Sequence, residues 1–554
     1  MKKFYEKAKP LLSILLLCVI FSFMLVIFEP ISLYANNTND FWFDLYDMLP
    51  ELLPAFVILA VGSFLIFGLI YFISFKLFKK PAIFYILSLL FFAFFIITYI
   101  QGNFLSGSLP GLNGNPFNWR EYKVETAISI ILWAVVFIAL FIAIKKLSSK
   151  KVFTIIPAIT LVVFAMLFVS LITTLATTRA LEDKNTSKAT LDYYNQVSNQ
   201  QNFFIFLVDA IDSRSFDALL KDSSDYQKTF KDFSYYQDTL SYYPYTRDSI
   251  PQIFYSTPNE NETEFDDYSR KAFSESPIIN SLASEKYNMY FYDDQVIMSA
   301  DTAELFKNMS NATRINSSNF LYEIFRYDLF KYLPFPLKGK AHIENSNFWT
   351  ADLEEGHNEF VWGDRVNYNI YKNEPLEIVD DKVFHFIHLE GAHIWFNLDE
   401  DLNPIDKTKG TYSQKQAATM KVIKAYIDRL KKADVYDKSS IVIMSDHGYM
   451  DGVWEYDYIL NRFNPSLYIK GVNEHHNQMV RSDKPISFAD LSDAFEQLRL
   501  GAKSTELFQN INSPRTRTLI YYIWNQENHM VEYTTEGKAW DDTSMVETGR
   551  IFDR

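Results

Sequence analysis

Cysteine is nearly absent from this chain of 554 residues, because Cys18 is the only one and no intramolecular disulfide can form. Any exported part must therefore rest on its hydrophobic core, which favours a bacterial envelope where disulfides are not exploited, such as a Gram-positive one. An excess of positive charge is also missing, since the formal net charge is −14. This acidic balance argues against nucleic acid as a partner.

Charge is missing altogether from five long apolar windows, which cover 11–28, 53–75, 82–100, 126–144 and 152–178. Each is close to the roughly 20 residues that cross a hydrocarbon core as a helix. A helical hairpin in a soluble core could be this apolar once, but five such windows within 180 residues predict a transmembrane domain over 1–178. The windows hold no ionisable side chain, which argues against a transporter.

Lysines gather at alternate ends of these windows: before the first, between the second and third, and between the fourth and fifth (Lys2, Lys3, Lys7, Lys9; Lys76, Lys79, Lys80; Lys145, Lys146, Lys150, Lys151). Basic flanks tend to stay in the cytoplasm. An odd number of spans that begins inside ends outside, so we expect everything after about residue 180 to be extracytoplasmic. Leu33-Tyr34-Ala35 lacks the small residue of a signal-peptidase site, so the first helix is expected to be a retained anchor.

The rest of the chain is expected to form a polar connector, 179–201, and an extracytoplasmic domain, 202–554. Short apolar runs predict strands at 203–208, 287–294, 383–391, 439–448 and 465–471, and the stretch 412–432 has the apolar spacing of an amphipathic helix. Strands that alternate with such helices indicate an α/β fold with a mostly parallel central sheet. In such sheets ligands bind beyond the carboxyl ends of the strands.

Two acidic motifs stand at those positions. Asp209 follows the strand 203–208, although a helix-capping aspartate is an equally good explanation. Ser445-Asp446-His447-Gly448 follows another strand, and Gly448 permits a turn in which both preceding side chains point to one cation. Carboxylates and imidazoles are ordinary ligands of zinc and manganese. An incidental surface turn is the alternative.

Thr246 lies in the segment "YYPYTRDSIPQIFYS". A hydroxyl is a poor nucleophile, but coordination to a divalent metal favours its alkoxide. Taken alone, Thr246 would more simply be a turn threonine.

In combination and order these motifs resemble the alkaline phosphatase superfamily, and within it the membrane-anchored, sulfatase-like phosphotransferases that include lipoteichoic acid synthases and phosphoethanolamine transferases. The resemblance implies one divalent ion, Mn²⁺ or Zn²⁺, held by Asp209, Thr246, Asp446 and His447. It implies that Thr246 is the nucleophile. It also implies that His393, in "HLEGAHIWF", contacts the transferred phosphate and protonates a leaving group.

The implied activity is that of a multi-pass cell-membrane enzyme. It would transfer phosphoglycerol or phosphoethanolamine from a membrane phospholipid to an envelope glycan or glycolipid through a phosphothreonine. The family usually carries glutamate where this chain has Asp209, so the nearby Asp212 could substitute or assist. The glycerol-binding tryptophan and arginine of the phosphoglycerol branch have no counterpart at the usual distance, which leaves the headgroup open.

Three alternatives stay open. One is a membrane-anchored phosphodiesterase or sulfatase-like hydrolase of envelope esters. The formylglycine signature of true sulfatases is absent, however, because Tyr242 and Thr246 flank Pro244 at the relevant spacing. The others are a transporter and a non-catalytic scaffold, and the latter would not need Thr246, Asp446 and His447 together. Among the other histidines, we expect His388 in the core and His475 and His476 in exposed loops.

Overall fold

The computed structural model describes residues 2–38, 41, 43–105, 119, 121–182, 188–259, 265–293, 298–310, 315–341, 343, 360–449, 460–523 and 529–552. The chain forms two compact units. One comprises Met1–Lys184 with Thr313–His357, and the other comprises Asn185–Ala312 with Asn358–Arg554. Part of the expected connector, 183–187, lies outside the described residues.

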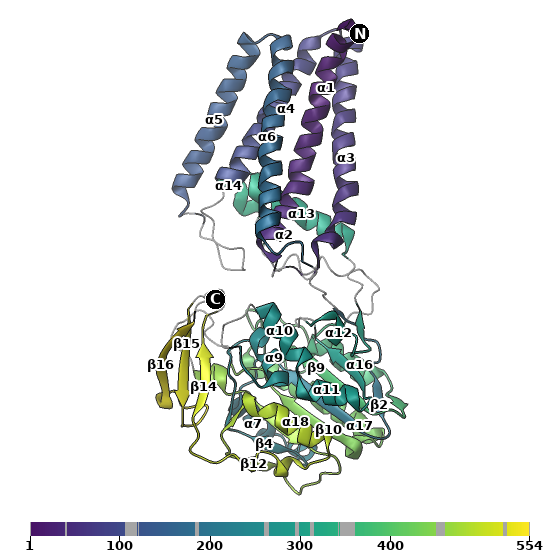
Figure 1. Cartoon of the computed structure of the whole chain (residues 1–554), viewed down its shortest axis with the longest axis vertical. Helices are drawn as coiled ribbons and strands as arrows, with labels where there is room; N and C mark the ends of the chain where they lie inside the picture. Colours follow the sequence, from purple (N-terminus) through teal and green to yellow (C-terminus); the bar gives the residue numbers. More distant parts are fainter. Residues whose placement is uncertain are drawn as a thin grey trace. The chain divides into compact units, whose positions relative to one another are not determined.

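The first unit contains the five predicted long apolar helices, which Figure 1 shows side by side. Among the described residues, five helical stretches are long and apolar enough to cross a membrane: Lys9–Asn36, Leu45–Leu77, Pro81–Phe104, Lys123–Lys146 and Lys150–Thr177. They comprise α1 (Lys2–Phe23), the π-helical turn η1 (Met24–Phe28), α2 (Glu29–Asn36), α3 (Leu45–Phe72), the π-helical turn η3 (Ile73–Leu77), α4 (Pro81–Phe104), α5 (Lys123–Lys146) and α6 (Ser149–Thr177). The prediction of five such helices is confirmed.

The first of these helices is longer than its apolar window. It continues without a break through η1 and α2, so that Glu29 lies within it and is fully buried. The predicted window 11–28 ended one residue before Glu29. The statement that the spans hold no ionisable side chain is therefore wrong for this helix as it is folded.

The described residues 315–341 belong to the unit of the apolar helices, although they lie inside the range expected for the α/β domain. They form α13 (Ser317–Tyr332), α14 (Phe335–Lys338) and the short turn η4 (Gly339–Ala341). Hydropathy could not reveal this placement, because α13 alternates apolar and polar residues as a helix of a soluble domain does.

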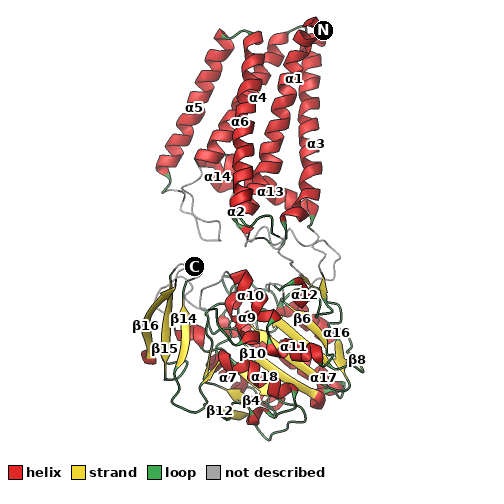
Figure 2. Cartoon of the chain, in the orientation of Figure 1, coloured by secondary structure: helices red, strands yellow, loops and turns green. Residues whose placement is uncertain are grey.

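All named strands belong to the second unit, as the yellow arrows of Figure 2 show. A seven-stranded sheet has the order β12-β4-β11-β10-β3-β9-β6. The pairs β10–β3, β3–β9 and β9–β6 are parallel, whereas β11 is antiparallel to both of its neighbours. The mostly parallel α/β fold is thus confirmed, with strands β3 (Asn202–Val208), β4 (Ser234–Tyr236), β6 (Asn288–Tyr292), β9 (Val383–Leu389), β10 (Ser439–Met444), β11 (Leu467–Lys470) and β12 (Val480–Ser482).

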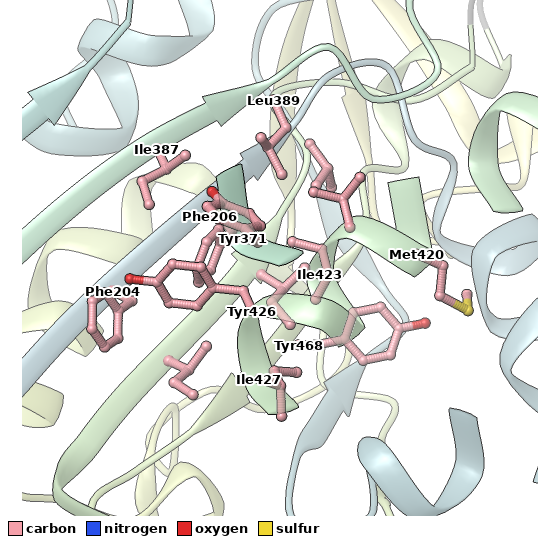
Figure 3. Close-up of a cluster of buried hydrophobic side chains, with 14 of the residues drawn as sticks. Phe204, Phe206, Tyr371, Ile387, Leu389, Met420, Ile423, Tyr426, Ile427 and Tyr468 are labelled. Carbon is pink, nitrogen blue, oxygen red and sulfur yellow. The ribbon is translucent and has the colours of Figure 1, made fainter. Parts of the chain in front are cut away.

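The central strand β3 is buried on both faces of the sheet. Phe204 and Phe206 pack against α17 (Tyr412–Lys432), whose Ile423 and Tyr426 lie in the same cluster (Figure 3). The alternate side chains of β3 join a second cluster with α9 (Thr246–Tyr255), α11 (Pro277–Ser284) and α18 (Leu491–Arg499). A parallel strand covered on both faces needs such a continuous apolar run, which leaves its carboxyl end as the place for polar chemistry.

Candidate active site

Asp209, Asp446 and His447 come together because their strands are parallel neighbours. Leu207 of β3 pairs with Met444 of β10, so the residues that follow both strands leave the sheet at the same edge. The structure places Asp209 one residue after β3, and Asp446 and His447 just after β10. The helix cap considered for Asp209 is supplied instead by Asp212, whose carboxylate accepts hydrogen bonds from the backbone N–H groups of Arg214 and Ser215 at the start of α7 (Ser213–Asp222).

Three buried ligand atoms converge within 4.8 Å of one another, one each from Asp209, Asp446 and His447. His447 Nε2 lies 3.7 Å from Asp209 Oδ1 and 3.3 Å from Asp446 Oδ2. Neither of these carboxylate oxygens has a hydrogen-bond partner among the residues that the structure describes. Buried unpaired carboxylate oxygens are costly, and their convergence on one imidazole nitrogen fits a cation that all three would bind.

The other nitrogen of His447 fixes the ring. His447 Nδ1 lies 2.8 Å from the carbonyl oxygen of Gly448. A carbonyl can only accept, so Nδ1 carries a proton, and in the neutral imidazole Nε2 presents its lone pair to the carboxylates. This is the second contact that metal-binding histidines usually make.

Thr246 adds a hydroxyl to this group. It is the first residue of α9, is 8% exposed, and donates a hydrogen bond from Oγ1 to Asp209 Oδ2 at 3.2 Å. The helix N-terminus also favours an anion at this position, because its first backbone N–H groups are not used within the helix. The structure therefore brings together the four residues predicted as metal ligands and leaves their roles as predictions.

The chain before Thr246 is supported by an aromatic cluster. Tyr242, Tyr243 and Tyr245 pack with Ile520 and Tyr522, which lie at and just beyond the end of β14 (Arg517–Tyr521). This C-terminal sheet was not predicted, yet it holds the loop that presents the candidate nucleophile.

Arg462 is a positive group that the sequence did not single out. Its guanidinium lies 5.0 Å from the centre of the Tyr245 ring, and its Nη1 is buried with no hydrogen-bond partner in the described part of the chain. Its backbone carbonyl accepts the N–H of Gly448 at 2.7 Å. The arginine therefore contacts both the residue before Thr246 and the Asp-His-Gly turn, and its charge would favour an anion there.

His393 is carried by a turn that lies directly on the backbone of Asp209. Gly391 has φ +62°, and a Cβ there would lie 2.3 Å from the Asp209 carbonyl oxygen. The N–H of Ala392 donates to that same oxygen at 2.8 Å. The buried ammonium of Lys415 lies 2.6 Å from a carboxylate oxygen of Glu390 and holds the start of the turn.

His388 is buried as expected, but it has polar partners that a core histidine lacks. Its Nδ1 lies 2.6 Å from Asp293 Oδ2, and its Nε2 lies 3.4 Å from Asp209 Oδ2. Trp362 lies 5.3 Å from the rings of both His388 and His393. The sequence did contain one sign of this polar role, since His388 lies near the carboxyl end of its predicted strand. In the structure His388 is paired with Leu207, two residues before Asp209.

These histidines dominate the electrostatics of Asp209. Burial alone would raise its pKa, but His393, His388 and His447 outweigh that effect and lower the pKa to about 2. Burial would lower the pKa of His388, but Asp293 and Asp209 raise it well above its usual range. The carboxylate is thus held in its charged, ligand-competent form.

The remaining candidates lie outside this group. Asp212 caps α7 and lines a cavity of about 480 Å³ together with Arg214, Tyr412 and Tyr449. His475 is exposed near Asp437, as expected, whereas His476 is only partly exposed and lies 2.9 Å from Glu474.

No protein-family model and no curated protein matches the chain. Solved structures do match. A protein in the alkaline phosphatase superfamily from Vibrio parahaemolyticus is 12% identical, with a TM-score of 0.38, and the match covers 66% of this chain and 85% of that one. The lipoteichoic acid synthase LtaP from Listeria monocytogenes is 12% identical, with a TM-score of 0.35 and coverage of 67% and 91%.

The C-terminal periplasmic domain of EcEptC from Escherichia coli is 11% identical, with a TM-score of 0.32 and coverage of 63% and 92%. The superfamily that the motifs resemble is thus represented among the similar structures. At these identities and TM-scores the likeness says nothing about a substrate, so the chemistry of the site rests on its own side chains.

Proposed function

We propose that this chain is a membrane-anchored, metal-dependent phosphotransferase. It would move a phosphoalcohol group, phosphoglycerol or phosphoethanolamine, from a membrane phospholipid to an envelope glycan or glycolipid. The observation that carries the proposal is the convergence of the Thr246 hydroxyl with three buried ligand atoms. Two of the carboxylate oxygens there have no hydrogen-bond partner among the described residues. A scaffold would have no use for such a costly arrangement.

Asp209, Asp446, His447 and Thr246 would hold one divalent ion. Two carboxylates, an imidazole and a hydroxyl suit Mn²⁺ or Zn²⁺. When bound, such an ion neutralises charge on phosphate oxygens and favours the alkoxide of a bound hydroxyl.

The proposed reaction consists of two displacements at phosphorus. Thr246 Oγ1 forms a bond to phosphorus, and the bond from phosphorus to the diacylglycerol oxygen breaks. The hydroxyl proton passes to water, because the Asp209 carboxylate that accepts it in a hydrogen bond is held in its charged form. His393 gives its proton to the leaving alkoxide.

The acceptor then restores the site. Its hydroxyl oxygen attacks the phosphothreonine, its proton passes to His393, and the Thr246 oxygen leaves and takes a proton back from water. If water were the acceptor, the same steps would make the chain a phosphodiesterase, which is the second candidate.

The five apolar helices support the choice of a lipid donor. An enzyme that is tethered at the bilayer meets a phospholipid ester at a high effective concentration. We place the second unit on the extracytoplasmic side. The lysine-rich turns mark the cytoplasmic ends of the helices, and the chain leaves the last helix, α6, at its other end.

The test is mass spectrometry of the full chain, purified in detergent and incubated with Mn²⁺ and total bacterial lipid. We expect a covalent adduct on the peptide that contains Thr246, with the mass of the transferred phosphoalcohol, and none in Thr246→Ala. Product on a glycan favours transfer, and free phosphoalcohol favours hydrolysis. Full envelope modification in cells that carry only Thr246→Ala would exclude the proposed chemistry.

A further inference from the structure

The segment Ser317–Ala341 packs on the apolar helices although the sequence inserts it between parts of the α/β unit. α13 contacts α3 and α4, and α14 contacts α5. A Cβ on Gly102 of α4 would lie 2.2 Å from the ring of Tyr332, so this close approach requires glycine. Trp119 packs against Phe330 and Phe335, with ring centres 6.3 and 6.2 Å apart.

The contacts identify the end of the bundle at which this segment lies (Figure 1). Gly102 is near the carboxyl end of α4. The lysines at 76–80 and 145–151 belong to the opposite ends of α3, α4 and α5. By the charge rule for membrane proteins, α13 and α14 therefore lie at the extracytoplasmic end.

A buried ion pair fixes the segment there. Glu29 is fully buried, forms an ion pair with Lys331, and accepts a hydrogen bond from the Tyr332 hydroxyl at 2.7 Å. Burial, and then the charge of Glu29, raise the pKa of Asp328 well above its usual range, and the charge of Lys331 acts in the opposite direction. On α5, Ser129 Oγ accepts the backbone N–H of Phe335 at 3.1 Å.

The docked segment exposes large apolar and aromatic side chains, together with the polar side chains of Ser317, Ser318, Asn319 and Lys340 near its two ends. Tyr322, Phe325 and Leu337 are 60%, 58% and 40% exposed, whereas Phe320 and Ile324 of α13 are buried against the bundle. Helices that lie in a membrane interface bury such a face among the lipid headgroups and the start of the acyl chains. Aromatic residues are enriched at this depth.

We propose that α13 and α14 lie in the outer interface of the bilayer, with Tyr322, Phe325 and Leu337 in contact with lipid. Lipid is the expected occupant because the same unit exposes apolar side chains along its long helices, such as Ile58 (72%) and Ile138 (60%), which only a bilayer would cover. The inference rests on the proposed membrane location of these helices and is independent of the proposed chemistry.

The experiment uses the full chain with Cys18→Ser in nanodiscs of phosphatidylglycerol and phosphatidylethanolamine. A nitroxide is attached to a single cysteine introduced as Phe325→Cys. Its collision rates are measured with oxygen, which concentrates in lipid, and with a water-soluble nickel chelate. Ile138→Cys on α5 gives the lipid reference, and Lys438→Cys, at the exposed end of a short turn in the α/β unit, gives the water reference.

We expect the ratio of oxygen to nickel collisions at position 325 to exceed the ratio at position 438 severalfold and to approach that at position 138. A ratio equal to that at position 438 would overturn the interfacial placement. Low collision rates with both reagents would also overturn it, because another protein surface would then cover α13. A water-like ratio at position 138 would instead refute the membrane location itself.

Discussion

Asp209 uses its two carboxylate oxygens for different purposes. Oδ2 accepts the Thr246 hydroxyl and lies 3.4 Å from His388 Nε2. Oδ1 lies 3.7 Å from His447 Nε2 and has no hydrogen-bond partner within the described ranges of the chain. One oxygen is therefore held by the protein, and the other is available to a cation.

His388 orients Asp209, so we predict that His388→Leu weakens Mn²⁺ binding by about 10–100-fold, the usual effect of losing a residue that orients a ligand. His388→Gln, which keeps a side-chain N–H donor, should recover part of this affinity. Titration calorimetry of the metal measures it without reference to activity.

His385→Leu is the matched control, because His385 is equally buried on β9 but lies among the rings of Phe204, Tyr290 and Tyr292. It should leave Mn²⁺ affinity unchanged. Equal losses of affinity in both variants would mean that His388 acts only through packing.

Asp364 is expected to make the free energy of unfolding depend on pH. Burial, with a contribution from Glu390, raises its pKa to about 7. The folded protein therefore binds the Asp364 proton more tightly than the unfolded chain does. This proton stabilises the fold fully below the unfolded pKa near 4, and the stabilisation is lost as the pH rises through about 7. The difference corresponds to at most about 4 kcal/mol.

We therefore expect Asp364→Asn to flatten the dependence of unfolding free energy on pH between about pH 4 and pH 8. Urea unfolding of the full chain in detergent at several pH values measures this slope. An unchanged slope would show that Asp364 is ionised in the native protein.

At the scale of single elements, the turn at Gly391 couples the strand end to His393. Gly391→Ala adds a Cβ that would lie 2.3 Å from the Asp209 carbonyl oxygen, in a conformation that already disfavours a side chain. We predict loss of both metal affinity and transfer activity, with a stability cost above about 1 kcal/mol.

Gly501→Ala is the control that introduces backbone strain without a steric clash. Gly501 also has positive φ, at +93°, but its nearest neighbour would be 3.8 Å from the new Cβ. This variant should lose some stability and keep its metal affinity, as measured by thermal melting and calorimetry. A similar loss of affinity in both glycine variants would contradict the proposed role of the 391 turn.

The ion pair of Glu29 ties α13 to the first apolar helix. Glu29→Leu leaves the Lys331 ammonium without its carboxylate, and we predict a loss of about 3–5 kcal/mol in the stability of the helical unit. The double variant Glu29→Leu/Lys331→Leu should recover much of it, since no charge is then left without its partner.

Denaturation of the full chain in mixed detergent micelles provides the measurement. The exposed pair Arg179–Glu182 is the control, and Glu182→Leu should cost less than about 1 kcal/mol. If the single Glu29 variant were as stable as that control, the buried pair would not hold α13.

For the molecule as a whole, a bound ion would link three segments that lie far apart in sequence, around Asp209, Thr246 and Asp446. Mn²⁺ at 100 times its dissociation constant should stabilise the native state by about 2.7 kcal/mol. Thermal melting with and without a chelator measures this, and Asp446→Asn should abolish the difference. A melting temperature that is the same with added Mn²⁺ and with a chelator would argue against a metal site.

Much of this molecule follows from patterns that are local in sequence. Charge-free windows located the five long helices, and apolar spacing located α17 at 412–432. Strand ends located Asp209 and the Asp-His-Gly turn. In each case a short stretch of sequence is enough for the prediction, because the spacing of apolar residues within a few turns or one strand indicates which side chains are buried.

The features that were not predicted depend on partners far away in the chain. The polar role of His388 requires Asp293, which is 95 residues earlier. The docking of α13 requires Glu29, and the support of the Thr246 loop requires the C-terminal strand β14. A single sequence contains no local sign of such pairs, because either partner alone resembles an ordinary core or surface residue.

The pairing of Glu29 with Lys331 also sets an order for biosynthesis. The two residues are 302 positions apart, so Glu29 leaves the ribosome long before its lysine is made. At about 5–20 residues per second the delay is roughly 15–60 s. Throughout that interval the first helix holds a carboxylate whose partner does not yet exist, and a nascent chain stalled before residue 331 would present an unfinished bundle to the quality-control proteases of the cell.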